Sequence, residues 1–348
     1  MPESVLLSEI AEQPSVLERL IAEAAPEVEA VASTVRARSI HHVVIAARGS
    51  SDNAARYAQY VLGAHNRMTV TLATPSLVTR YRSPPVMTGA LVVGISQSGE
   101  SPDLVAVVEE GRRQGCPTLA VTNVAGSPLA VVADHTIVLR AGQERSIAAT
   151  KTYTAQLTAL AMLSTAIAQD GEWKRQLADV PGFVAAAHDV DRGAVLAAAA
   201  TLKDAGHGVV LGRGFNFATA FEAALKAKEL AYVAVEPYSS ADFQHGPIAL
   251  IDTGFAAVVI NAAGAVSEEV EDLLRAICER GARPVVMSNL PSSLALAAAP
   301  IPIPAGMPEW LSPIAAIVPG QLLAFHLSRL RGFDPDQPRG LKKVTKTT

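Results

Sequence analysis

The second half of the chain repeats much of the first half at a nearly constant offset, and this repeat limits the possible folds more than any other feature. The matching segments are His42–Ala54 with Gly208–Ala220, Thr88–Ser96 with Thr253–Asn261, and Gly115–Asn123 with Gly281–Asn289. Arg48 and Arg213 stand at equivalent places in the first pair. Each segment contains a short apolar run of the kind that forms a buried strand. We interpret the repeat as two copies of one α/β domain.

Each copy reads as strand, helix, strand, helix, strand. In the first copy, the apolar run 90–96 precedes a helical pattern that starts at Ser101-Pro102 and stops at Gly115. Such alternation predicts a doubly wound parallel sheet covered by helices on both faces, a flavodoxin-like α/β/α arrangement of three layers. The predicted divisions are a helical lead-in at 1–35, a first domain at 36–165, a helical linker at 166–200, a second domain at 201–332 and a tail at 333–348.

Composition excludes several classes of protein. The 348 residues are 49% hydrophobic and 18% charged, which argues against disorder and coiled coil. The 29 basic residues are balanced by 33 acidic ones, and they form no basic block, so we expect no nucleic-acid partner. The two cysteines, Cys116 and Cys278, lie far apart in the sequence, which is the spacing of neither a disulfide scaffold nor a zinc knuckle and fits a reducing compartment.

No membrane segment or secretion signal is expected either. The N-terminus carries acids where a signal peptide would carry bases. The most apolar stretch, Ser292–Leu327, is interrupted by six prolines: Pro300, Pro302, Pro304, Pro308, Pro313 and Pro319. A membrane helix needs about 20 apolar residues in a row, so we predict buried loop and helix in a cytoplasmic protein.

The two copies differ in the loops that follow their first two strands. The first copy has polar side chains there: Ser50 and Ser51 in one loop, and Ser96, Gln97, Ser98 and Ser101 in the other. The matching positions of the second copy are Phe215, Asn216, Asn261, Ala262, Ala263 and Val266. Hydroxyl groups beside a helix N-terminus, where backbone N–H groups and the helix dipole converge, favour phosphate. The first copy is therefore the predicted phosphate site, although each serine alone could instead cap a helix or turn the chain.

The loops match no nucleotide-binding motif. The first copy has no Gly-Lys-Ser/Thr ending of a P-loop, and Arg48-Gly49 does not begin a G-x-G-x-x-G pattern. We therefore expect no dinucleotide. We also expect no other cofactor and no metal.

The second copy carries ionisable residues instead. Glu222, Lys226 and Glu229 are spaced so that they share one face of a helix. Glu236, Asp242 and His245 follow, in a predicted loop that ends at Gly246-Pro247. An acid, an amine and an imidazole near one strand end are the components of a proton-transfer site. The alternatives are a surface ion pair for Lys226 and Glu229, a loop-anchoring hydrogen bond for His245, and plain solvated charges for Lys342 and Lys343 in the tail.

At these residues the chain resembles the SIS (sugar isomerase) family. The resemblance is to the isomerase half of glucosamine-6-phosphate synthase (glutamine–fructose-6-phosphate aminotransferase) and to the SIS-type glucosamine-6-phosphate deaminases. The matching pieces occur in the family's order and span nearly the whole chain: EIAEQP, ARGSS, ISQSGES, AATKTYTAQL, ALKAKELAY, QHGPIALI and DPDQPRGLKKVT.

The resemblance implies roles for these residues. The sugar phosphate would be held by Ser51, Ser96, Gln97, Ser98 and Ser101, with Ser50 beside them. Glu229 would move a proton between C1 and C2 of the open-chain sugar, and Lys226 would assist near the ring oxygen. His245 would help to open the ring, reaching into the site of a neighbouring subunit, which requires a homodimer. Lys343 would close over the sugar and form a Schiff base with the ketose.

Departures from the family narrow the expected reaction. The synthase begins with a glutaminase domain, whereas this sequence starts Met1-Pro2-Glu3 and continues into the isomerase region. We therefore expect the deaminating direction, from glucosamine 6-phosphate to fructose 6-phosphate and ammonia. Ala149 stands where the synthase has a serine near the substrate, and Lys342 replaces an alanine beside the tail lysine.

Two other readings stay open. One is an isomerase or deaminase of a related compound, such as galactosamine 6-phosphate or a glycated-amine 6-phosphate. The other is a sugar-phosphate sensor without turnover, which would need an effector module such as a helix-turn-helix. The short N-terminal lead-in shows no such module, and a sensor has no reason to keep Glu229, His245 and Lys343 together.

Overall fold

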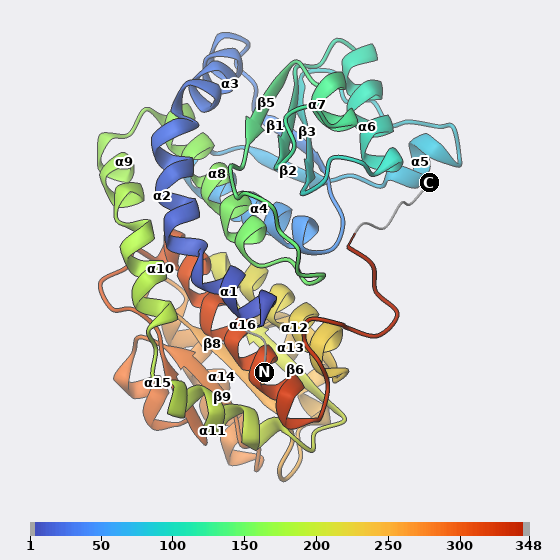
Figure 1. Ribbon diagram of the computed structural model, residues 1–348. Coiled ribbons are helices and arrows are strands. Elements are labelled where there is room, and N and C mark those ends of the chain that lie inside the picture. Colours follow the sequence, from blue (N-terminus) through green and yellow to red (C-terminus); the bar gives the residue numbers. More distant parts are fainter. Residues whose placement is uncertain (1–3, 344–348) are drawn as a thin grey trace. The chain divides into compact units, whose positions relative to one another are not determined.

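A computed structural model describes residues 4–343 and contains two five-stranded parallel sheets within that range (Figure 1). The first sheet has the order β2-β1-β3-β4-β5, with strands β1 His42–Ala46, β2 Thr69–Leu72, β3 Ala90–Ser96, β4 Thr118–Thr122 and β5 His135–Val138. The second has the order β10-β9-β8-β6-β7, with strands β6 His207–Gly212, β7 Ala234–Ser239, β8 Ala257–Asn261, β9 Val285–Ser288 and β10 Ala299–Pro302. Taken in chain order, the two sheets have the same topology, which confirms the duplication and the doubly wound fold class.

Helices cover both faces of each sheet. Those before β6 are α1 Val5–Ala11, α2 Gln13–Glu23, α3 Ala25–Ala37, α4 Ser50–Asn66, α5 Pro75–Thr79, α6 Pro102–Arg113, α7 Pro128–Val132, α8 Lys151–Ala168, α9 Gly171–Ala178, α10 Val180–His188 and α11 Arg192–Leu202. Those after it are α12 Phe217–Ala231, α13 Ser240–Gln244, α14 Ser267–Glu279, α15 Pro291–Ala295 and α16 Ser312–Leu330, with short 3₁₀ turns η1 Gly214–Asn216, η2 Pro247–Leu250 and η3 Glu309–Leu311. Around the first sheet, α3, α4 and α8 pack together on one face and α5, α6 and α7 on the other (Figure 1).

The chain divides into two compact units, each built around one sheet. The first-sheet unit consists of residues 15–144, 151–179 and 342 onward. The second-sheet unit consists of residues up to 14, 145–150 and 180–341. Both units are therefore discontinuous in sequence, so the segments 145–150 and 342–343 belong to different units from the residues just before them. The outer ends of the predicted lead-in and tail, 1–3 and 344–348, lie outside the described residues.

The central strands are buried at every position, as their apolar runs predict. All residues of β3, β4, β8 and β9 are buried. The edge strands were not evident from the sequence: β2 and β5 have four residues each, most of them only half-buried or exposed, and β7 contains Pro237. Proline is tolerated in an edge strand because its missing N–H can face away from the sheet.

One buried helix crosses the stretch that the prolines were expected to interrupt. Among the described residues, Glu309–Leu330 is the one helical stretch long and apolar enough to cross a membrane, and 94% of its apolar window is buried inside the protein. Pro319 lies within α16 and does not end it, so the prediction of an interruption there is wrong. The helix packs against α10, α11 and α12, whose contacts hold it despite a proline cost of about 3 kcal/mol.

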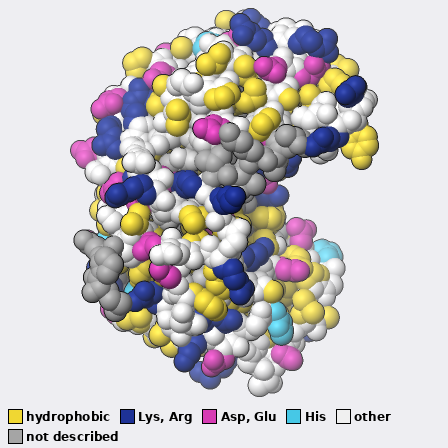
Figure 2. Space-filling view, turned by 45° about the vertical axis from the view of Figure 1, so that its right-hand side comes forward, with side chains coloured by type: hydrophobic (Ala, Val, Ile, Leu, Met, Phe, Trp, Pro, Cys, Tyr) yellow, Lys and Arg dark blue, Asp and Glu magenta, His cyan; other side chains and the backbone are white. Residues whose placement is uncertain are grey.

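Charged side chains of both signs are interspersed on the molecular surface. Figure 2 shows Lys and Arg scattered among Asp and Glu, with no continuous basic area on the face in view. This mixed face agrees with the near balance of 29 basic and 33 acidic residues.

Close packing of α6 on β3 depends on Gly111. A Cβ atom at Gly111 would lie 2.7 Å from Val92 Cγ2 and 2.8 Å from Val92 Cβ. Valine is stiff at χ1, so it cannot move aside without displacing the strand or the helix. This contact matters for function because α6 carries Ser101 at its N-terminus.

We predict that Gly111→Ala lowers the free energy of unfolding by about 1–3 kcal/mol, the usual range for overpacking. Urea unfolding followed by circular dichroism measures this. The matched control is Gly182→Ala in α10, where a Cβ meets nothing within 4 Å. That change should raise stability by about 0.4–1 kcal/mol, because alanine restricts the unfolded chain. Equal effects of the two variants would contradict the packing account.

Candidate functional site

Two loops of the first-sheet unit meet at the point where the strand order reverses. β1 and β3 are neighbours with parallel register, for instance Ala46 beside Gly94. Their carboxyl ends lead into the loop before α4 and the loop before α6, respectively. In doubly wound folds the crevice between two such loops is where ligands bind. The predicted phosphate-binding residues all lie in or beside these loops: Ser50, Ser51, Ser96, Gln97, Ser98 and Ser101.

Three serine hydroxyls in these loops already accept a hydrogen bond. Ser96 Oγ accepts from the Gly99 N–H at 3.1 Å, and Ser98 Oγ accepts from the Glu100 N–H at 3.3 Å. Ser51 Oγ accepts from Gln156 Nε2 at 3.0 Å. A hydroxyl that accepts in this way can still donate its own O–H. Ser96 and Ser98 therefore do stabilise the turn of their loop, as the alternative interpretation proposed. Each hydroxyl can nevertheless still donate its O–H to an anion.

The backbone around these hydroxyls also suits an anion. Gly49 is the N-cap of α4 with φ 55°, a left-handed conformation that favours glycine, and a Cβ there would meet nothing within 4 Å. Ser101 is the N-cap of α6, and its side chain makes no capping hydrogen bond. The first turns of two helices therefore open beside the same loops, with the positive ends of their dipoles.

An ion pair joins the two loops. Arg48 donates to Asp103 Oδ2 through Nε at 3.1 Å and through Nη2 at 2.9 Å. The Asp103 side chain is only 3% exposed, whereas that of Arg48 is 52% exposed. The buried carboxylate, on the first turn of α6, thus fixes the loop that follows β1. This pair was not predicted from the sequence.

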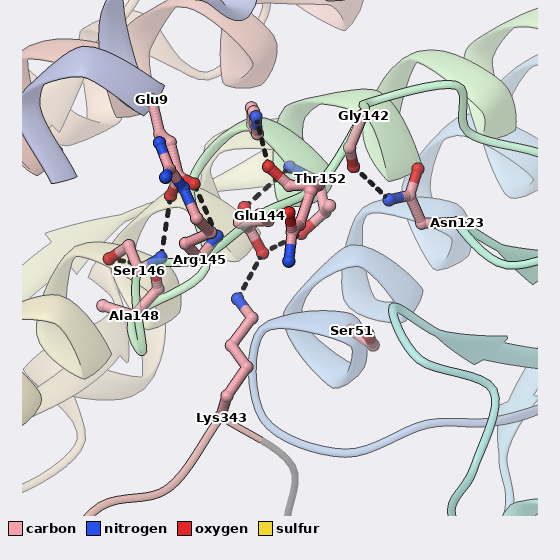
Figure 3. Close-up of polar contacts among 12 residues, drawn as sticks. Glu9, Ser51, Asn123, Gly142, Glu144, Arg145, Ser146, Ala148, Thr152 and Lys343 are labelled. Atoms are coloured by element: carbon pink, nitrogen blue, oxygen red, sulfur yellow. Dashed lines mark hydrogen bonds and ion pairs between the residues drawn. The ribbon is translucent and has the colours of Figure 1, made fainter. Parts of the chain in front are cut away.

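The tail lysine also lies in the first-sheet unit, where it is bound to a buried carboxylate. Lys343 Nζ is 2.7 Å from Glu144 Oε2, and the Glu144 side chain is fully buried (Figure 3). Glu144 also accepts from the Thr152 N–H at 3.1 Å and from Thr152 Oγ1 at 2.8 Å. The plain solvated-charge reading of Lys343 is therefore wrong, because its amine has a specific buried partner.

Helix α8 connects this lysine contact with the serine loops. Thr152 binds Glu144, and Gln156, four residues later, binds Ser51. Residues four apart lie on the same face of a helix, with Cβ atoms about 5–6 Å apart. Two residues on successive turns of one face of α8 therefore hold these groups: Thr152 holds the amine of Lys343 through Glu144, and Gln156 holds the hydroxyl of Ser51.

In the second-sheet unit, the predicted helix face is confirmed. Lys226 Nζ lies 2.6 Å from Glu229 Oε2 and 3.4 Å from Glu222 Oε1. The side chains of Lys226 and Glu222 are fully buried, and that of Glu229 is 24% exposed. A surface ion pair is therefore excluded. Of the two carboxylates that bind this buried lysine, Glu229 is the one that is partly open to solvent.

The other ionisable residues of this unit lie after α12. His245 is exposed at the C-cap of α13, where its backbone N–H binds the Asp242 carbonyl at 3.1 Å. The predicted loop for Glu236, Asp242 and His245 is wrong in part: Glu236 lies in β7, where it accepts from Tyr238 Oη at 2.5 Å, and Asp242 lies in α13.

In the second copy, a side chain of the protein occupies the loop that is equivalent to the predicted phosphate loop before α6. Glu309 Oε2 accepts from the Ala265 N–H at 2.8 Å, and the glutamate packs closely on Gly264. Asn261, equivalent to Ser96, donates to Ser267 O and Ser293 Oγ. The sister crevice is thus occupied by an internal carboxylate. Within residues 4–343, no group of three His, Cys, Asp or Glu residues lies close enough to hold a metal ion.

Comparison with known proteins identifies the family. The SIS domain matches residues 38–166 and 201–330, which are the two copies of the repeat. The chain belongs to the SIS domain family. Solved structures with the same fold match it over almost its full length.

Among the curated relatives, the glutamine–fructose-6-phosphate aminotransferase of Aeropyrum pernix is 36% identical over 97% of this chain and 56% of its own length. The chain spans about half the length of the curated relatives it matches first. The C-terminal domain of the Francisella tularensis glucosamine-fructose-6-phosphate aminotransferase has a TM-score of 0.84 at 26% identity, covering 96% of this chain and 98% of that one. The Thermotoga maritima glucosamine-6-phosphate deaminase shares the fold, with a TM-score of 0.78 at 23% identity over 99% and 100% of the two chains.

We predict that Ser98→Ala weakens binding of fructose 6-phosphate about tenfold or more, because it removes one hydrogen bond to a charged group. Isothermal titration calorimetry measures the dissociation constant. Ser33→Ala, on the exposed side of α3, is the control and should leave affinity unchanged. Unaltered affinity of Ser98→Ala would show that the phosphate binds elsewhere.

Proposed function

We propose that this chain converts glucosamine 6-phosphate and water into fructose 6-phosphate and ammonia, as an aminosugar-phosphate isomerase and deaminase. One observation carries the proposal: successive turns of one face of α8 hold the hydroxyl of Ser51, through Gln156, and the amine of Lys343, through Thr152 and Glu144. A phosphate binder needs only the hydroxyls. An amine held on the same helix face adds a nucleophile for the sugar's carbonyl carbon.

The isomerisation step requires one base that reaches two adjacent carbons. In the proposal, Glu229 removes the proton from C2 of the open-chain aminosugar and returns it to C1. The intermediate is an enolamine with a double bond between C1 and C2. When C1 takes up the proton, C2 becomes an imine. Glu229 suits this role because its carboxylate is partly exposed and is bound by the buried ammonium group of Lys226. Lys226 itself would stabilise negative charge that develops near the ring oxygen.

The nitrogen then leaves by exchange at C2. The neutral amine of Lys343 attacks the C2 imine, and ammonia departs as a Schiff base forms on Lys343. Water hydrolyses that Schiff base to give fructose 6-phosphate and restores the lysine. Carbon, nitrogen, oxygen and protons balance over these steps. C1 is reduced as C2 is oxidised, so no external oxidant or reductant is required.

The residue at position 149 favours an alternative substrate. Ala149 is half-buried and lies two residues before the first residue of α8, the helix that binds both Glu144 and Ser51. The resemblance to the synthase implies a serine near the substrate at this position. A methyl group offers no hydrogen bond in its place, so in this alternative the protein would accept a sugar whose hydroxyl has the other orientation. Galactosamine 6-phosphate, or a glycated-amine 6-phosphate, is therefore the alternative substrate.

The direct test is to incubate the purified protein with glucosamine 6-phosphate and to measure ammonia and fructose 6-phosphate together. Equal amounts of both support the proposal. Turnover of galactosamine 6-phosphate instead supports the alternative. Formation of fructose 6-phosphate from glucose 6-phosphate, without ammonia from either aminosugar, would show a plain isomerase. Binding of sugar phosphates without any turnover would point to a sensor and overturn the proposal.

Glu229→Gln separates catalysis from binding. We predict that kcat falls at least 100-fold, since the amide cannot accept the proton, while the dissociation constant for fructose 6-phosphate changes less than threefold. Ammonia release and calorimetry give the two values. The control is Glu269→Gln, an exposed carboxylate of the same unit that pairs with Arg213. Native kcat in Glu229→Gln would rule out this glutamate as the base.

We further propose that the active form is a homodimer in which His245 assists ring opening in the partner's site. His245 is exposed, as a residue that acts outside its own protomer must be. Two inactive variants, Glu229→Gln and His245→Ala, should then complement each other when refolded as a mixture. In a hybrid dimer one site has both native residues, so a statistical mixture should recover about a quarter of native activity. A mixture with no more activity than its components would contradict the shared site.

A further inference from the structure

The buried carboxylate of Glu144 has an unusual set of partners for a structural residue. Its Oε1 accepts the Thr152 N–H in the first turn of α8, and its Oε2 accepts both the Thr152 hydroxyl and the Lys343 amine. The Glu144 side chain is fully buried, whereas that of Lys343 is 25% exposed (Figure 3). The helix N-terminus and the threonine fix the carboxylate, and the lysine is its outward-facing partner.

We propose that Glu144 is a positioning residue for Lys343: it holds the amine beside the serine loops and takes up its proton when the amine attacks the sugar. This inference rests on the proposed function of Lys343 as the nucleophile. It adds a residue that was not assigned from the sequence, because Glu144 and Lys343 are 199 residues apart in the chain.

The chemistry requires such a partner. An ammonium group has no lone pair, so Lys343 must lose a proton before it can attack carbon. Transfer of that proton to Glu144 turns the ion pair into a neutral amine and a neutral carboxylic acid. The net charge of the buried pair does not change, so no charge has to leave a poorly solvated place. When the Schiff base is hydrolysed, the proton returns to the lysine nitrogen.

Helix α8 links the amine of Lys343 to the proposed phosphate site. The phosphate is proposed to lie at the loops that contain Ser51, which Gln156 binds from α8. Thr152, one helical turn earlier, positions Glu144 and through it Lys343. In this proposal, the phosphate of an open-chain sugar 6-phosphate lies at Ser51, and its carbonyl carbon, several bonds from phosphorus, lies at the amine of Lys343.

The second copy of the repeat has an acid in the corresponding segment, where it makes a different contact. Glu309 lies between β10 and α16, as Glu144 lies between β5 and α8, and its carboxylate accepts the Ala265 N–H of its own loop. In that copy the acid closes the crevice. In the first copy, the acid binds the tail lysine and leaves the serine loops available to a ligand.

The test is covalent trapping of fructose 6-phosphate on Lys343. Borohydride donates a hydride to the Schiff base and converts it into a stable secondary amine, which mass spectrometry of tryptic peptides detects. In the native protein, the lysine proton moves within the pair, so the trapping rate should be nearly independent of pH in the neutral range. In Glu144→Gln, the proton must go to solvent. The rate should fall about 100-fold at pH 7 and then rise about tenfold per pH unit.

Controls separate this role from simple loss of packing. Glu9→Gln removes another buried carboxylate, which accepts from the N–H groups of Arg145 and Ser146, the two residues after Glu144. This variant should keep the native trapping rate and pH profile. Glu229→Gln should still trap the ketose, because trapping needs no proton transfer between C1 and C2.

These outcomes distinguish the two proposals. Trapping that follows the predicted pH profiles without ammonia release would support the role of Glu144 and refute deamination. A Glu144→Gln rate that is reduced equally at every pH would refute proton uptake and leave a purely structural residue. A native rate that itself rises tenfold per pH unit, or no adduct on Lys343 at any pH, would overturn the inference.

Discussion

The parallel pairing of β1 with β3 is the constraint on which the site depends. Because the strands run side by side in the same direction, their carboxyl ends lie at one edge of the sheet. The helices that follow them leave toward opposite faces, so two helix N-termini open on one crevice. The Arg48–Asp103 pair then joins the loops, and α8 supplies Gln156 to Ser51. The serine hydroxyls are consequently in place before any ligand arrives.

Duplication placed the same crevice in both units, and side chains made the two different. In the first-sheet unit, serines line the loops, and Gly49 keeps the backbone accessible. In the second-sheet unit, Glu309 fills the crevice, and the chemistry-bearing residues lie on α12 instead. The proposed phosphate site and the proposed base therefore lie in different copies of the repeat. The cost is a fully buried ion pair, Lys226 with Glu222, which is stable only because both partners are present.

The central strands and one candidate site could be predicted from the sequence, because both depend on local sequence patterns. The apolar runs identified the central strands, and spacing placed Glu222, Lys226 and Glu229 on one helix face. The edge strands β2 and β7 were missed because exposed residues and Pro237 remove the apolar pattern. The Glu144–Lys343 contact joins residues 199 apart, and no periodicity reports such a pair. The Arg48–Asp103 pair was missed for the same reason, since Arg48 lies in the loop after β1 and Asp103 in the first turn of α6, 55 residues later.

The most direct measurement is a crystal structure of the protein with fructose 6-phosphate. The account predicts phosphate oxygens within hydrogen-bond distance of Ser51, Ser96 and Ser98 Oγ, and Lys343 Nζ directed at C2 of the sugar. Glu309 should remain bound to the Ala265 N–H, with the second crevice still closed. A phosphate bound at residues 261–266, or a sugar bound in the first crevice with Lys343 directed away from it, would contradict the account.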